Sequence, residues 1–263
     1  IELLKSGSYA MTKVSSATMA NFATEYKVLG VPYLFRSKDH MFKVLEGSTG
    51  KGILEAGSDY LLKGLCFYDA GSRSFYTVKK PVKTPDDLEG MKIRVMNHQM
   101  SVDMVNEMGA SATPMAYGEL YSALDSGIVD GAHWGASQGA FSMGLYEVAK
   151  YHVQPALNIA GTDVIIVSQK ALNKLPEDMQ NIVKQALEEQ FWFRTNEYQY
   201  KERITLAKAI SEHNVQVNTL PEDVQDRLTQ AAQKMWDEEG KRSDNAQKAL
   251  DMLKDYLSEL GYL

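Results

Sequence analysis

Residues 84–95 read Thr-Pro-Asp-Asp-Leu-Glu-Gly-Met-Lys-Ile-Arg-Val, and this stretch decides which fold we expect. An acidic, turn-like run ends at Gly90, after which apolar residues occupy every second position. Alternation with a period of two predicts a β-strand with one buried face. Lys92 and Arg94 share the opposite face, and Arg94 lies close to the end of the strand. We interpret Arg94 as a group that awaits an anion from outside the protein.

Short helices and short strands alternate on the C-terminal side of this strand. The pattern predicts a helix over residues 101–108 that ends at Gly109, and an extended segment over 112–117. A second short helix over residues 120–125 stops at Gly127. Such alternation predicts βαβ units and an α/β fold class.

A much longer helix is predicted between Pro176 and His213. This segment contains no glycine and no further proline, and acidic residues follow Pro176 as a helix N-terminus favours. Roughly 35 helical residues would extend about 50 Å, which is longer than one small domain is wide. The apolar positions do not form a regular heptad, so we interpret the segment as a helix that braces two lobes.

The composition excludes several classes of protein. The chain has 263 residues, of which 44% are hydrophobic and 24% charged, and its net charge of -6 disfavours nucleic acid as a partner. No apolar run approaches the roughly 20 residues that span a bilayer, and no signal peptide is visible. The absence of a signal peptide does not exclude export. The single cysteine, Cys66, leaves both a cytosolic and an exported location open.

An ordered series of motifs runs through most of the chain. The motifs are PYLFR (32–36), GSR (71–73), PDDLEGMKIRV (85–95), GASATPM (109–115), ELYSAL (119–124), GIVDG (127–131), YEVAKY (146–151) and LPED (175–178). The series resembles the solute-binding subunit of tripartite ATP-independent periplasmic (TRAP) transporters. The resemblance implies a periplasmic protein that closes a small organic acid, such as a keto acid or dicarboxylate, between two α/β lobes. It also implies crossing strands between the lobes and delivery of the acid to a pair of membrane permease subunits.

The resemblance also divides the chain. It assigns residues 1–72 and 160–199 to a first lobe and residues 73–159 and 200–263 to a second, with the helix of about 176–213 along both. The chain starts inside the family's first lobe, so an N-terminal strand–helix–strand portion is expected to be absent. Either the chain is a trimmed piece or this lobe is abbreviated.

Two arginines match positions with which the family binds a carboxylate. Arg94 matches the arginine that clamps the carboxylate, and a guanidinium offers a planar fork for this purpose. Because burying an unpaired charge is unfavourable, we expect Arg94 to be partly open to water. The alternatives are a surface arginine or one paired with Asp86 or Asp87. Arg73 matches a supporting arginine, or is an ordinary turn residue.

The segment 129–137 departs from the commonest family pattern at His133 and Trp134. Trp134 resembles a keto-acid and hydroxy-acid subgroup in which a glutamate and the tryptophan carbonyl help to hold a bridging metal. His133 replaces that glutamate, so a metal is doubtful here, and no other cofactor is expected. His133 either donates to a hydroxyl, keto group or second carboxylate, or is a buried structural histidine. Tyr117 matches an aromatic residue that packs on the ligand, or is a core residue.

Further candidates are weaker. Asn97, His98 and Gln99 follow the Arg94 strand and are expected to line the cleft. Asp163 is expected near the inter-lobe crossing, although an acid at a strand start is usually structural.

A catalytic function has little support in the sequence. Ser137, His133 and Asp130 lie within one loop, which does not establish the geometry of a catalytic triad. No nucleotide-binding loop, zinc motif or nucleophile elbow occurs. An enzyme acting on small acids and a ligand sensor remain the alternatives to a transport protein, and the C-terminal helices are a candidate interaction surface.

Overall fold

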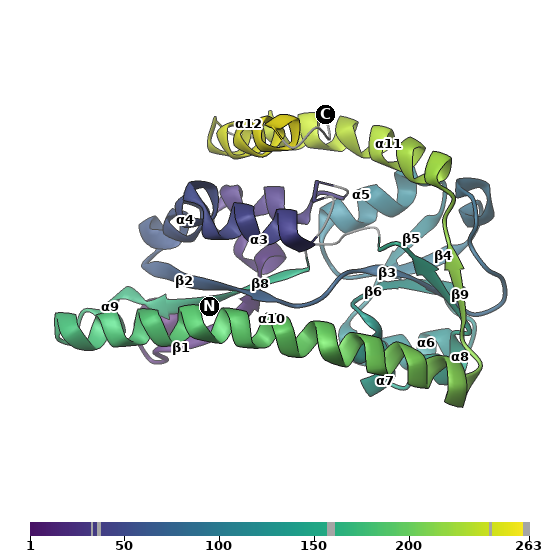
Figure 1. Cartoon of the computed structure of the whole chain (residues 1–263), viewed down its shortest axis with the longest axis horizontal. Helices are drawn as coiled ribbons and strands as arrows, with labels where there is room; N and C mark the ends of the chain where they lie inside the picture. Colours follow the sequence, from purple (N-terminus) through teal and green to yellow (C-terminus); the bar gives the residue numbers. More distant parts are fainter. Residues whose placement is uncertain (33, 36–37, 157–160, 242–243, 260–263) are drawn as a thin grey trace.

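The computed structural model describes residues 1–32, 34–35, 38–156, 161–241 and 244–259, which form two β-sheets packed with helices (Figure 1). This arrangement confirms the predicted α/β class. The smaller sheet has the strand order β1-β8-β2 and is antiparallel throughout. Its strands are β1 (Met11–Ser15), β2 (Leu62–Asp69) and β8 (Thr162–Ser168).

The larger sheet has six strands in the order β5-β4-β6-β3-β7-β9. β3 runs antiparallel to both of its neighbours, whereas the other pairs are parallel. Its strands are β3 (Ser74–Thr77), β4 (Lys92–Val95), β5 (Ser111–Pro114), β6 (Gly131–Trp134), β7 (Tyr151–Gln154) and β9 (Gln216–Thr219).

Helices surround both sheets, and α10 (Glu177–His213) is the longest of those described. The others are α1 (Glu2–Ser6), α2 (Ser16–Met19), α3 (Lys38–Glu46), α4 (Ser48–Glu55), α5 (Gln99–Glu107), α6 (Leu120–Asp125), α7 (Ser137–Ser142), α8 (Leu145–Val148), α9 (Gln169–Leu172), α11 (Glu222–Gly240) and α12 (Asp244–Glu259). Four 3₁₀ helices complete the described elements: η1 (Thr24–Gly30), η2 (Ala56–Tyr60), η3 (Pro85–Leu88) and η4 (Tyr117–Glu119).

β4 is more completely buried than its sequence pattern predicts. Ile93 and Val95 are buried as expected, but Arg94 on the other face is buried too, and Lys92 alone is exposed. β5 and β6 pair with its two edges. α5 contacts β4 as well, and the Trp134 ring lies over the Arg94 guanidinium, so both faces are covered, as in the centre of many α/β sheets.

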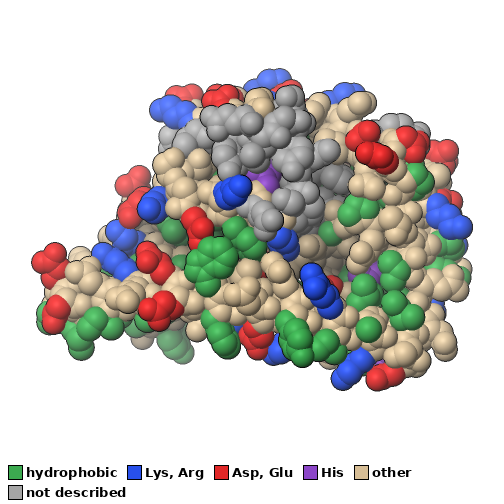
Figure 2. Space-filling model, in the orientation of Figure 1, with side chains coloured by type: hydrophobic (Ala, Val, Ile, Leu, Met, Phe, Trp, Pro, Cys, Tyr) green, Lys and Arg blue, Asp and Glu red, His purple; other side chains and the backbone are tan. Residues whose placement is uncertain are grey.

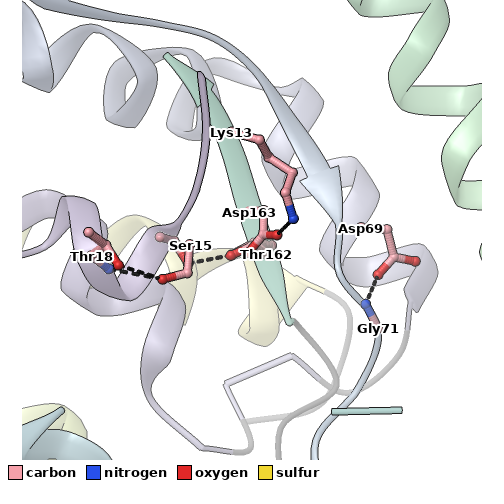
Figure 3. Close-up of polar contacts among 8 residues, drawn as sticks. Lys13, Ser15, Thr18, Asp69, Gly71, Thr162 and Asp163 are labelled. Atoms are coloured by element: carbon pink, nitrogen blue, oxygen red, sulfur yellow. Dashed lines mark hydrogen bonds and ion pairs between the residues drawn. The ribbon is translucent and has the colours of Figure 1, made fainter. Parts of the chain in front are cut away.

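Two chain segments cross between the sheets. One leads from β2 to β3 and the other from β7 to β8, and the Ala70 amide donates to the Gly161 carbonyl at 2.7 Å where they meet. Gly71 has a φ of 83°, and its amide donates to the Asp69 carboxylate at 2.9 Å (Figure 3). A Cβ atom on Gly71 would lie 2.5 Å from the ring of Tyr198 on α10, so the crossing requires glycine there.

The predicted long helix is confirmed, because α10 is continuous over 37 residues. It contacts β2 of the small sheet near its middle and α7 and α8 of the larger half towards its end, and it runs beneath both sheets in Figure 1. α12 packs against η1 and α4. The lobe boundaries, which place residues 200–263 in the second lobe, stay a prediction.

The outer side of α10 carries exposed apolar side chains. Figure 2 shows hydrophobic groups along the lower edge of the molecule, where α10 lies, with acidic and basic groups interspersed over the face. Within the described residues, no helix has both the length and the apolar character needed to cross a membrane. The exposed apolar residues of α10 are Met179, Ile182, Trp192, Phe193, Tyr200, Ile204 and Ile210.

Gly161→Ala is expected to destabilise the fold by about 1–3 kcal/mol, the usual result of overpacking. A Cβ atom at this position would lie 1.8 Å from the Gly71 carbonyl oxygen, so the crossing segments would have to separate. Gly52→Ala is the control, because a Cβ at this exposed position in α4 meets nothing within 4 Å. It should stabilise the protein by about 0.5–1 kcal/mol. Urea unfolding measures both, and equal effects would contradict the tight crossing.

Candidate functional site

A cavity of about 40 Å³ lies between the two sheets and receives side chains from both. Residues around β1 and β8 form one wall, and residues of β3, β6 and α5 with its preceding loop form the other. The space suffices for about one water molecule, so an organic acid requires the two walls to move apart. The polar residues of the lining are Ser15, Ser16, Thr162, Arg73, His98, Ser101 and His133.

Hydroxyl groups dominate the polar chemistry of the first wall. The Ser16 hydroxyl donates to the Thr162 carbonyl at 2.7 Å and lies 2.8 Å from the Thr162 hydroxyl. The Ser15 side chain caps α2 by accepting from the Thr18 amide at 3.2 Å (Figure 3). Behind this wall, the Lys13 ammonium contacts the Asp163 carboxylate at 2.5 Å. The cavity therefore meets neutral hydroxyls, while Asp163 is engaged with a lysine.

Arg73 reaches the cavity from the residue before β3. Burial lowers the pKa of its guanidinium, and the negative charge of Asp163 acts in the opposite direction, as does Tyr198. Arg73 thus lies in the field of an acid of the first wall. This arrangement brings the predicted site residues Arg73 and Asp163 near each other across the inter-lobe crossing.

Arg94 is buried without an acid. Its side chain donates from Nη2 to the Met115 carbonyl at 2.8 Å, whereas Nε and Nη1 have no hydrogen-bond partner. Among the residues that the structure describes, no carboxylate forms an ion pair with it. Burial lowers its pKa to about 10, and the charge of Arg73 acts in the same direction.

The expectation that Arg94 is partly open to water is wrong, because the residue is only 3% exposed. The aromatic residues beside it explain the difference. The Arg94 Cζ atom lies 5.1 Å from the centroid of the Trp134 ring, a distance at which a cation is attracted to the ring face. The centroid of the Tyr117 ring lies 5.3 Å from the centroid of the Trp134 ring, and Tyr117 is 62% exposed. Tyr117 therefore covers Trp134, which covers the guanidinium.

The alternative in which Arg94 pairs with a nearby acid is not observed. The Asp87 carboxylate accepts instead from the amides of Lys83 and Thr84, both at 2.9 Å. The Thr84 contact belongs to the capping box of η3, and both contacts lower the pKa of Asp87. Asp87 therefore stabilises the turn before β4 and does not form an ion pair with Arg94.

His133 lines the cavity and is 4% exposed. Neither ring nitrogen has a hydrogen-bond partner, and the ring packs edge-on against Phe75 at 5.9 Å. Burial, together with the charges of Arg73 and Arg94, lowers its pKa to about 3. The imidazole is consequently neutral at any physiological pH.

Arg94 and His133 approach the site from opposite faces of the larger sheet. Arg94 is in register with Ala132, which places it on the same face as Trp134, whereas His133 projects to the other face. Arg94 does not itself line the 40 Å³ cavity. The charge of Arg73 nevertheless acts on both Arg94 and His133, so both arginines contribute to the positive charge near the cavity.

The weaker candidates are placed differently. Asn97 is exposed and does not line the cavity. Gln99 is exposed as well, and its amide donates along α5 to Asp103 at 2.7 Å. His98 does line the cavity, and burial lowers its pKa. Of Asn97, His98 and Gln99, His98 alone lines the cavity.

One residue that sequence reasoning missed holds the segment after β6. Glu202 on α10 accepts hydrogen bonds from the amides of Ser137 at 2.7 Å and Gln138 at 3.1 Å. Its carboxylate thereby caps the N-terminus of α7, which only Gly135 and Ala136 separate from β6. The segment that carries His133 and Trp134 is therefore fixed by the long helix. A separation of 65 residues along the chain leaves no local pattern from which to find this contact.

The residues present do not fit a bridging metal. Within the described chain, no group of three or more His, Cys, Asp or Glu side chains could hold a metal ion. His133 stands where a metal-binding glutamate would, and hard cations favour oxygen ligands. The charges of Arg73 and Arg94, which already disfavour a proton on this imidazole, equally disfavour a cation beside it.

Two α/β sheets joined by crossing segments, with a cationic region between them, define a two-lobed binding protein. Comparison with known proteins specifies the family. Residues 1–242 match the bacterial extracellular solute-binding proteins of family 7 (DctP). The chain belongs to this family.

Three relatives illustrate the similarity. A solute-binding protein of Chromohalobacter salexigens is 34% identical over 72% of this chain, which spans only 56% of that protein. A TRAP periplasmic solute-binding protein of Bradyrhizobium, solved in complex with α/β-D-galacturonate, is 32% identical with a TM-score of 0.87. One from Chromohalobacter salexigens with bound D-glucuronate is 28% identical with a TM-score of 0.90. Each structural match covers 97% of this chain and 83% of the other.

Acidification is expected to lower the free energy of unfolding between about pH 6.5 and 4. Burial lowers the pKa of His133 to about 3 and of His152 to about 4, whereas an unfolded histidine titrates near 6.5. In this window the unfolded chain binds more protons, so stability rises with pH and is lost as pH falls. Each histidine contributes up to about 1.4 kcal/mol per pH unit.

Urea unfolding of the wild type and of His133→Gln at several pH values measures this contribution. Between pH 5 and 6.5 the variant should show the shallower dependence, and between pH 7 and 8 the two should run parallel. Parallel behaviour over the whole range would show that His133 titrates normally in the folded chain.

Proposed function

We propose that the protein is a periplasmic solute-binding protein that captures a small organic acid between its two lobes and delivers it to TRAP permease subunits. The observation that carries the proposal is the buried Arg94 guanidinium, with two unpartnered nitrogens and no ion-paired carboxylate among the described residues. A ligand carboxylate would supply the missing charge and accept from a free nitrogen, either Nε or Nη1, on an edge that the nitrogen shares with Nη2. Trp134 and Tyr117 would then exclude water from the ion pair and strengthen it.

Closure follows from the division of the site between the two walls. Arg73 and His133 belong to one wall, while Ser15, Ser16 and Thr162 belong to the other. An acid that contacts both walls binds the closed arrangement better than an open one, and this difference in affinity drives closure. The crossing at Gly71 and Gly161 is where the backbone would bend, with α10 extending along both halves.

Binding without turnover fits the geometry better than catalysis. The Asp130 carboxylate accepts from the Lys92 amide at 2.9 Å, and the Ser137 amide is held by Glu202. Asp130 therefore belongs to the start of β4 and does not orient His133 for general-base catalysis. The relatives described above are also named as solute-binding proteins.

Sugar acids are the first class of ligand to test, because two relatives were solved with galacturonate and glucuronate. A thermal-shift screen should include uronates, hydroxy acids, keto acids and C4-dicarboxylates. A ligand that binds the native state stabilises it by RT ln(1 + [L]/Kd) and so raises its melting temperature. Flat melting curves across the whole panel would oppose the proposal.

Arg94→Ala is expected to weaken binding of the best acid by about 2–5 kcal/mol, since it removes the charge partner of the carboxylate. Arg94→Lys keeps the charge but loses the planar fork, and it should bind with intermediate affinity. Isothermal titration calorimetry measures each Kd directly.

Arg203→Ala is the matched control, because Arg203 is an exposed arginine on α10. Its affinity should equal that of the wild type. If Arg94→Ala binds as tightly as this control while both variants remain folded, Arg94 is not the carboxylate site.

A further inference from the structure

His133 presents buried hydrogen-bonding capacity that no described residue uses. A neutral imidazole carries one N–H donor and one acceptor nitrogen. Both are buried in the wall of the cavity without a protein partner. A buried polar atom left unpaired costs about 1–3 kcal/mol, so this position favours a ligand that satisfies it.

The surroundings of His133 restrict the chemistry of such a ligand. Phe75 covers part of the ring, and the guanidiniums of Arg73 and Arg94 contribute the positive charge nearby. Carboxylates are attracted to those arginines rather than to a neutral ring. A keto oxygen or a second carboxylate can only accept a hydrogen bond, whereas a hydroxyl can donate to one tautomer or accept from the other.

The opposite wall has matching chemistry. Ser15, Ser16 and Thr162 place neutral hydroxyl-bearing side chains on the cavity, and the Ser16 and Thr162 hydroxyls already lie 2.8 Å apart. Such groups exchange hydrogen bonds with alcohols without requiring a charge on the ligand. Both walls therefore favour a hydroxylated body attached to the carboxylate.

Building on the proposed function, we propose that His133 is a specificity-determining residue that hydrogen-bonds a ligand hydroxyl. The site accordingly prefers hydroxylated acids to the corresponding acids that lack the hydroxyl. A site that pairs a buried polar group with a substrate hydroxyl discriminates strongly against the deoxy analogue, because the protein group is then left unpaired.

The test uses pairs of acids that differ by one hydroxyl, such as malate with succinate and a uronate with its monodeoxy derivatives. Calorimetry gives Kd for each acid with the wild type, His133→Gln and His133→Leu. For at least one pair, the wild type should prefer the hydroxylated acid by about tenfold or more. The leucine variant should bring the two affinities within about twofold, and glutamine, which can both donate and accept, should retain part of the preference.

Controls separate this inference from the proposed function. Arg94→Ala should weaken both members of each pair by a similar factor, since it acts on the shared carboxylate. If no acid binds, the proposed function fails. If acids bind but the wild type has no hydroxyl preference, or His133→Leu retains the full preference, the role of His133 fails.

A spectroscopic measurement covers the case in which His133→Leu does not fold. Imidazole ¹⁵N chemical shifts of the wild type, assigned with His133→Gln, should change on adding the hydroxylated acid. They should change much less with its deoxy partner at equal saturation. Equal shifts for both acids would overturn the proposal.

Discussion

A buried guanidinium that pairs with no acid among the described residues is the constraint on which the rest of the site depends. Removing Arg94 from water is unfavourable, and one carbonyl with one aromatic face offsets only part of that loss. The fold tolerates the arrangement because β4 is held on both sides by β5 and β6. A ligand carboxylate would supply the missing negative charge. The unpaired guanidinium therefore lowers the stability of the free protein, whereas the same guanidinium would stabilise the complex.

The crossing between the two halves is closely packed. Gly71 and Gly161 bring the two crossing segments into close contact, and Tyr198 of α10 lies against the crossing. One helical turn further along, Glu202 holds the start of α7, which follows β6 in the chain. The long helix thus contacts both the crossing and the segment that follows the strand carrying His133. In the proposed closure, α10 therefore links the crossing with the binding site.

Local patterns predicted what depends on local sequence. Alternation identified β4, and the absence of glycine and proline identified α10. The family resemblance named Arg94, Arg73 and His133 as ligand-binding candidates, and that role stays a prediction. The burial of Arg94 was missed because it depends on Trp134 and Tyr117, which come from other parts of the chain, and the orientation of Gln99 because Asp103 competes for it. The cap supplied by Glu202 and the wall formed by Ser15 with Thr162 join distant parts of the chain, which no periodicity reveals.

The most direct test of the central claim is a crystal structure of the complex with the acid that stabilises the protein most. The account predicts a ligand carboxylate within about 3 Å of Nε or Nη1 of Arg94, a distance typical of charge-assisted hydrogen bonds. Arg73 should lie nearby, and the two walls should enclose the remainder of the ligand. A ligand bound with its carboxylate elsewhere, and Arg94 still paired only with the Met115 carbonyl, would contradict it.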